Sequence, residues 1–146
     1  MILISACLIG EHVKYDGSHN FHKIARELYD TGRAIPVCPE VLGGLSTPRV
    51  PSEIVGEQVV SKTGIDVSSY FQKGAKKTLE IAKQHNITIA VLQARSPSCG
   101  SSLIYDGTFQ GNLIDGQGMT TRLLQKHGIK VITIDEYIRD YYETDR

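Results

Sequence analysis

The sequence predicts an α/β protein: a Rossmann-like three-layer sandwich with a four-stranded parallel core sheet and extra hairpins. Two observations support this class. Four short apolar runs are typical of buried strands, and segments with the one-face apolar spacing of helices separate them. Strands that alternate with helices in this way form a parallel sheet with helices on its faces. Because 146 residues suffice for one core, we expect residues 1–146 to form a single domain.

The first half of the chain should supply two strands, one helix and a long loop. Strands are expected at residues 1–7 and at about 34–38, with a helix between them that begins after the turn Asp16-Gly17-Ser18 and ends at Gly32. The segment from Val41 to Glu53 contains glycines and prolines and is expected to be irregular. Loops of that length are usually functional or disordered, and proline rigidity favours a functional one.

The second half should supply the remaining elements. A hairpin is expected at 54–60, with Gly56-Glu57 at its tip, followed by a helix capped by Asp66 and ended by Asn86. The other expected elements, in order, are a strand at about 87–92, a second hairpin around Asp106-Gly107 within 103–109, a helix from Thr120 or Thr121 to His127, a strand at 131–134 and a short last helix capped by Asp135.

Charge and apolar content exclude several classes of protein. Sixteen basic residues balance 16 acidic ones, so the chain lacks the basic footprint of nucleic-acid binders. No apolar stretch approaches the ~20 residues that span a bilayer, and the N-terminus lacks the positive region of a signal peptide. Without an export signal, an odd number of cysteines favours the reducing cytosol. We therefore expect a cytoplasmic protein with a small-molecule partner and neither nucleic acid nor membrane; a homodimer is left open.

Three cysteines are the most informative residues. Cys7, Cys38 and Cys99 each follow an apolar run that predicts a strand. In open α/β sheets the ligand crevice lies outside the carboxyl ends of the strands, so the three thiols can converge there as a metal site with one ligand position free. A lone free cysteine is most often a small buried hydrophobe. Structural zinc needs four ligands, and the spacings of 31 and 61 residues resemble no ferredoxin, so spacing alone leaves the metal open.

Polar residues near these cysteines could add chemistry. Glu40 follows Cys38 on a proline-stiffened turn and is either a general acid or base in the crevice or an exposed loop glutamate. Ser96 and Ser98 flank Pro97 just before Cys99, where their hydroxyls either orient a polar substrate or bond the local backbone. Arg49 and Glu53 are either a loop-anchoring ion pair or a substrate clamp, and the sequence does not separate the two.

Three sequence blocks together resemble a known bacterial family. They are Ser5-Ala6-Cys7-Leu8-Ile9-Gly10 with Lys14-Tyr15-Asp16-Gly17, Cys38-Pro39-Glu40 with Gly43-Gly44-Leu45 and Pro48-Arg49, and Ser96-Pro97-Ser98-Cys99-Gly100. In this order they are similar to the signature blocks of the 2-thiouracil desulfurase family, and the resemblance covers nearly the whole chain. This chain departs from the family pattern at Gln93, where the family has a lysine, and at Lys14, which replaces an arginine.

The resemblance implies an enzyme with a [4Fe-4S] cluster that has one open iron. Cys7, Cys38 and Cys99 would hold the cluster, and the open iron would take the sulfur of a thiolated pyrimidine base or nucleoside. Glu40 would act as proton shuttle, and Ser96 would hold the substrate or assist proton transfer. Water would replace the sulfur and sulfide would leave, a C=S hydrolysis without net electron transfer.

Two other functions remain open from the residues alone. The first is a non-enzymatic Rossmann-like domain that binds a small anion or nucleotide in the strand-end crevice, although Cys7-Leu8-Ile9-Gly10 lacks the dinucleotide fingerprint. The second is metal-free thiol chemistry with Cys38 or Cys99 as nucleophile and Glu40 as base. No histidine lies near either cysteine in the sequence to support the second.

Overall fold

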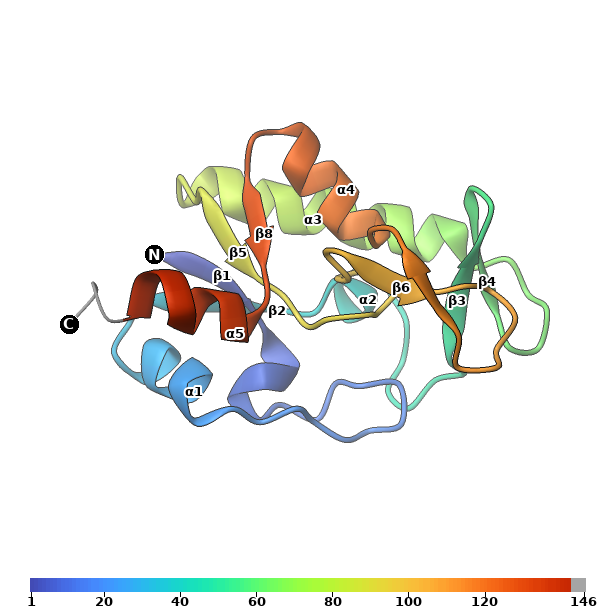
Figure 1. Ribbon diagram of the computed structural model, residues 1–146, viewed down its shortest axis with the longest axis horizontal. Helices are drawn as coiled ribbons and strands as arrows, with labels where there is room; N and C mark the ends of the chain where they lie inside the picture. The colour runs from blue at the N-terminus through green and yellow to red at the C-terminus, as the bar shows by residue number, and fades with distance from the viewer. Residues whose placement is uncertain (143–146) are drawn as a thin grey trace.

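Figure 1 shows a computed structural model of the chain, described for residues 1–142, with a twisted sheet between layers of helices. Four parallel strands form the sheet in the order β2-β1-β5-β8. Their bounds are Ile2–Ser5 for β1, Ala34–Val37 for β2, Ile89–Val91 for β5 and Lys130–Ile132 for β8. The predicted four-stranded parallel core sheet is confirmed. Because β2 and β5 flank β1 on opposite sides, the strand order reverses at the middle of the sheet, where α/β proteins bind ligands.

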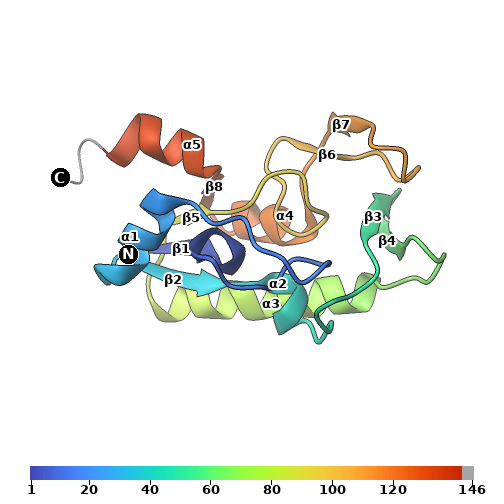
Figure 2. The same ribbon diagram turned by 90° about the horizontal axis from the view of Figure 1, so that it is seen from below.

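Helices cover both faces of this sheet, as Figure 2 shows from below. On one face lie α1 (Lys23–Asp30), α5 (Ile134–Tyr137) and a final turn of π-helix (Ile138–Tyr142); on the other lie α3 (Ser68–Gln84) and α4 (Met119–Lys126). Alternate residues of β1 face opposite ways: Ile2 and Ile4 pack with Leu28 of α1, and Leu3 packs with the α3–α4 side. Both faces are therefore apolar, which explains the nearly continuous apolar strands.

Two antiparallel hairpins lie at the end of the molecule away from the N-terminus (Figure 1). The first pairs β3 (Ser52–Val55) with β4 (Gln58–Ser61) around Gly56-Glu57, as predicted. The second pairs β6 (Leu103–Tyr105) with β7 (Leu113–Asp115), so its return strand lies beyond the predicted range and its loop is longer. A separate cluster of apolar side chains joins both hairpins to the start of α3.

Two segments near the cysteines differ from the sequence prediction. The first strand stops at Ser5, and Cys7 lies in a turn of 3-10 helix, Ala6–Ile9, that ends at Gly10 in the left-handed region. A four-residue helix, α2 (Pro39–Leu42), follows Cys38 and includes the first two residues of the segment that was expected to be irregular. Proline at the first helical position pre-sets the backbone for this turn. Both short helices begin where a sheet strand ends and so lie at the carboxyl edge of the sheet.

The helix caps also differ from the predicted ones. Val67 is the N-cap of α3, and Asp66 instead accepts a hydrogen bond from Ser68 N at 2.9 Å. Gly118 precedes α4, while Thr120 and Thr121 are buried inside it. For α5 the cap is Thr133, which forms a capping box with Glu136, rather than Asp135. None of the described helices is both long and apolar enough to cross a membrane.

Candidate active site

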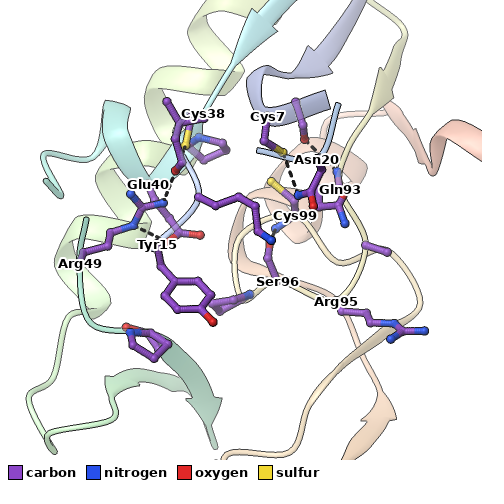
Figure 3. A pocket seen from close by; sticks show the side chains of 18 of the residues that line it. Cys7, Tyr15, Asn20, Cys38, Glu40, Arg49, Gln93, Arg95, Ser96 and Cys99 are labelled. Atoms are coloured by element: carbon purple, nitrogen blue, oxygen red, sulfur yellow. Dashed lines mark hydrogen bonds and ion pairs between the residues drawn. The ribbon is translucent and has the colours of Figure 1, made fainter. Parts of the chain in front are cut away.

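The three cysteines line one pocket at the carboxyl edge of the sheet. Cys7 follows β1, Cys38 follows β2 directly, and Cys99 lies on the loop after β5. In Figure 3, Cys7 and Cys99 stand beside Asn20 and Gln93, and Cys38 stands beside Glu40. All three thiols are free, with Cys7 and Cys99 buried and Cys38 half-buried. The structure therefore brings together the residues that the strand-end argument predicted to converge.

Burial and mutual proximity keep these thiols uncharged in the protein alone. Burial is the main cause that raises the pKa of Cys99 well above its ordinary value, and the charges of Glu40, Cys38 and Cys7 add to it. Burial also raises the pKa of Cys7 and of Cys38, with smaller contributions from Cys38 on Cys7 and from Glu40 on Cys38. As thiolates, the three cysteines would repel one another. A bound positive centre such as a metal would stabilise the three thiolates together, because a metal deprotonates the thiols that coordinate it.

Glu40 faces the same pocket from the first turn of α2. Its side chain is 17% exposed and forms an ion pair with Arg49, Nε to Oε1, at 3.0 Å. The hydroxyl of Ser98 donates to the other carboxylate oxygen at 2.7 Å. Position in the pocket and partial exposure leave Glu40 accessible to a ligand and to water.

The loop that carries Cys99 rests on the N-terminus of α4. Thr120 N and Thr121 N both donate to the carbonyl of Ser98, at 2.9 and 3.2 Å, and the Thr121 hydroxyl donates to Cys99 O at 2.9 Å. Ser96 Oγ accepts from Cys99 N at 2.8 Å, and its hydroxyl also lowers the pKa of the Cys99 thiol. The helix and these hydrogen bonds fix the position of Cys99 relative to the sheet.

Arg49 and Glu53 do not form the ion pair that the sequence allowed. Arg49 binds Glu40, whereas Glu53 accepts hydrogen bonds from Gly107 N at 2.9 Å and Phe109 N at 3.2 Å. Glu53 therefore anchors the loop between β6 and β7 to β3. Glu53 lines the pocket together with Tyr105 and Phe109 of the second hairpin, so the two hairpins form one of its walls.

Two carboxamides in the pocket complete the surroundings of the thiols. Asn20 Nδ2 donates to Cys7 Sγ at 3.4 Å, a contact that sequence reasoning missed because Asn20 lies in a loop 13 residues after the cysteine. Gln93 is half-buried, and its backbone N donates to Ser5 Oγ at 2.8 Å. Its side chain lies near Asn20 in Figure 3 and is uncharged, whereas Lys14, which also lines the pocket, lowers the pKa of Cys7 through its charge.

The size and the donor set of the site limit what it can bind. The cavity has a volume of about 770 Å³, within the range of small-molecule sites. Among residues 1–142, no three His, Cys, Asp or Glu side chains lie close enough to share a single metal ion. A mononuclear zinc site needs its thiolates about 2.3 Å from one atom. An iron–sulfur cluster distributes its thiolates over several iron atoms, so three soft thiols around one pocket fit such a cluster better.

Comparison with known proteins assigns the chain to a family. Residues 2–136 match the family model described as 2-thiouracil desulfurase. The chain belongs to this family. It is 44% identical over 146 residues to the uncharacterized protein YbbK of Bacillus subtilis (strain 168), covering 93% of this chain and 97% of that protein. It superimposes with a TM-score of 0.92 on the solved structure of the [4Fe-4S]-dependent thiouracil desulfidase TudS, at 42% identity, with 99% of this chain and 97% of that one covered.

The family assignment confirms the resemblance found in the sequence, and the superposition confirms the predicted fold.

Proposed function

We propose that this protein is a [4Fe-4S]-dependent desulfidase that releases sulfide from a thiolated pyrimidine, a thiouracil-like base or nucleoside. The observation that carries the proposal is the meeting of three free thiols and the Glu40 carboxylate in one pocket of small-molecule size. The activity printed for the structural relative TudS supports it. The three free thiols also favour a cytoplasmic location, since that compartment keeps cysteines reduced.

Cys7, Cys38 and Cys99 are the proposed ligands of the cluster. Held by these three cysteines, the cluster would keep one iron without a protein ligand and would supply a soft Lewis acid for a thiocarbonyl sulfur. The protein supplies a buried, largely preformed environment: Asn20 donates to Cys7 Sγ, and the Cys99 loop is fixed by Ser96 and α4. Cluster binding must displace the thiol protons, because burial raises the pKa of all three cysteines.

Glu40 is the proposed proton shuttle of a hydrolysis without redox change. Its carboxylate takes a proton from the water that attacks the ring carbon and gives it to the departing sulfur; the second proton of the water leaves with the sulfide when the new hydroxyl becomes the carbonyl. The balance is one thiocarbonyl and one water in, one carbonyl and one hydrogen sulfide out. Ser96, which lines the pocket beside Cys99, is proposed to hold the substrate or assist this transfer. We propose that residues 1–146 perform this reaction as a single domain.

A sulfide-release assay tests the proposal. Protein purified and reconstituted without oxygen is incubated with 2-thiouracil, 4-thiouracil and the corresponding nucleosides, and both sulfide and the oxygenated pyrimidine are quantified. We expect equal amounts of the two products from the wild type and, from Glu40→Gln with the cluster retained, a release that is slower by about a hundredfold or more but still measurable. Reconstituted protein that releases no sulfide from any of these compounds would overturn the proposal.

A further inference from the structure

Two buried side chains from distant segments hold the carboxylate of Glu40 at both oxygens. Arg49 Nε donates to Oε1 at 3.0 Å, and Ser98 Oγ donates to Oε2 at 2.7 Å. The Arg49 side chain is only 7% exposed, and Ser98 is 1% exposed. Figure 3 shows Arg49 reaching Glu40 at the side of the pocket where Cys38 lies. With both oxygens engaged, the side chain of Glu40 is restricted to one orientation.

Arg49 is itself fixed, because each nitrogen of its guanidinium donates a hydrogen bond. Nη1 donates to Ser46 O at 3.2 Å and to Thr47 Oγ1 at 2.9 Å, and Nη2 donates to Val13 O at 2.8 Å. Its backbone N donates to Tyr15 O at 2.7 Å. A planar guanidinium held in this way presents Nε in one direction, which a lysine ammonium cannot reproduce.

Ser98 is fixed from the other side of the pocket. Its carbonyl accepts from Thr120 N and Thr121 N at the start of α4. A Cβ at Gly118 would lie 2.4 Å from the Ser98 carbonyl carbon, so the loop and the helix are in direct backbone contact. The start of α4 therefore holds the backbone that carries the Ser98 hydroxyl.

The plainer explanation is that these contacts only stabilise the fold. A buried carboxylate needs partners whether or not it has a function, and removal of one partner from such a pair is destabilising. Glu40 is not fully buried, however, and it lines the pocket beside the cysteines. A carboxylate that served only stability would have no need to face the pocket and to stay partly exposed there.

We propose that Ser98 and Arg49 are positioning residues that hold Glu40 in the orientation needed for proton transfer. Neither is proposed to touch the substrate; each acts through Glu40. The inference rests on the proposed function, since it concerns the proton shuttle of that reaction. Misplacement of a reacting group by 1 Å can slow a reaction by about a hundredfold, so loss of one contact should reduce turnover more than binding.

Four variants of the reconstituted protein test this inference: Ser98→Ala, Glu40→Gln, the double variant, and Ser102→Ala as control. Ser102 is an exposed serine in the same loop. We expect Ser98→Ala to lower kcat by about 10- to 100-fold with KM within about twofold of the wild type. In the Glu40→Gln background the same change should cause no further loss, because the group that Ser98 positions is already gone. Arg49→Lys should also lower kcat with little effect on KM.

The outcomes separate the inference from the function on which it rests. The positioning role is wrong if the kcat of Ser98→Ala equals that of Ser102→Ala. It is also wrong if Ser98→Ala lowers kcat by the same factor in the wild-type background and in the Glu40→Gln background. Iron content and melting temperature, measured on every variant, identify a purely structural defect, which would lower kcat in both backgrounds. A wild type that releases no sulfide would overturn the proposed function and this inference with it.

Discussion

Backbone contact between α2 and α3 should set the place of Glu40, and Gly74→Ala tests this directly. Gly74 is buried in α3, and a Cβ added there would lie 1.9 Å from the carbonyl oxygen of Pro39 and 3.3 Å from Gly43 N. Gly43 faces it in turn, since its Cβ would lie 2.0 Å from the carbonyl oxygen of Tyr70. The helix that carries Glu40 therefore packs on α3 with no room for a methyl group.

The size of the effect follows from these distances. To bring the new Cβ and the Pro39 oxygen from 1.9 Å to the 3.0 Å that real Cβ atoms respect, α2 must move by roughly 1 Å. In an open helix position alanine would stabilise by about 0.5–1 kcal/mol relative to glycine. Here we expect a loss of about 1–3 kcal/mol from overpacking. A shift of that size at Glu40 should lower sulfide release by about a hundredfold.

Thermal unfolding and the sulfide assay measure the two consequences, with Lys77→Ala on the exposed side of α3 as control. For a domain of this size the melting temperature should fall by about 2–4 °C for each kcal/mol lost. The control should keep both properties of the wild type. A Gly74→Ala protein with unchanged melting temperature and unchanged sulfide release would refute the reasoning that this contact positions Glu40.

Three further predictions concern the thiols and the pocket wall. Cys38→Ala should reduce both iron content and sulfide release to background after reconstitution, while circular dichroism stays that of the wild type; an active, iron-loaded variant would contradict the three-thiol site. Glu53→Ala should release the loop between β6 and β7, because Gly107 N and Phe109 N lose their acceptor, and faster hydrogen exchange at these amides checks this; unchanged exchange would show that Glu53 does not anchor the loop. Burial raises the pKa of Cys99 well above its ordinary value of 9.0. At a pH between the pKa of the unfolded chain and that of the folded cluster-free protein, the folded protein therefore keeps the thiol proton that the unfolded chain has lost. The contribution of Cys99 to the free energy of unfolding should therefore be constant below about pH 8 and decrease as the pH rises past 9.0, so urea unfolding at several alkaline pH values should show a smaller decrease in Cys99→Ala.

The sequence predicted the elements whose signal is periodic and long. Apolar strand runs and amphipathic helices indicated the parallel sheet, and parallel strands end at one edge, so the convergence of Cys7, Cys38 and Cys99 followed from topology. The helix α2 was missed because four residues are too few to show a helical period. The prolines of the segment that follows α2 did favour a functional role for this part of the chain.

The remaining misses have tertiary causes. Thr120 and Thr121 looked like helix caps, yet the first N–H groups of α4 find their acceptors in the carbonyls of Pro97 and Ser98, so no capping side chain is needed. The sequence offered Glu53, four residues away, as the ion-pair partner of Arg49, but the structure pairs Arg49 with Glu40, nine residues away, and the packing of the hairpins places Glu53 against Gly107. Asn20 carries no local pattern that would connect it to Cys7.

Iron and sulfide analysis of the protein purified and reconstituted without oxygen tests the central claim most directly. If Cys7, Cys38 and Cys99 hold a [4Fe-4S] cluster, the wild type should be brown and contain about four iron atoms and about four labile sulfides per chain. The Cys99→Ala variant, treated in parallel, should contain background amounts of both. A colourless wild type with zinc at full occupancy, or a Cys99→Ala protein with as much iron as the wild type, would contradict the claim.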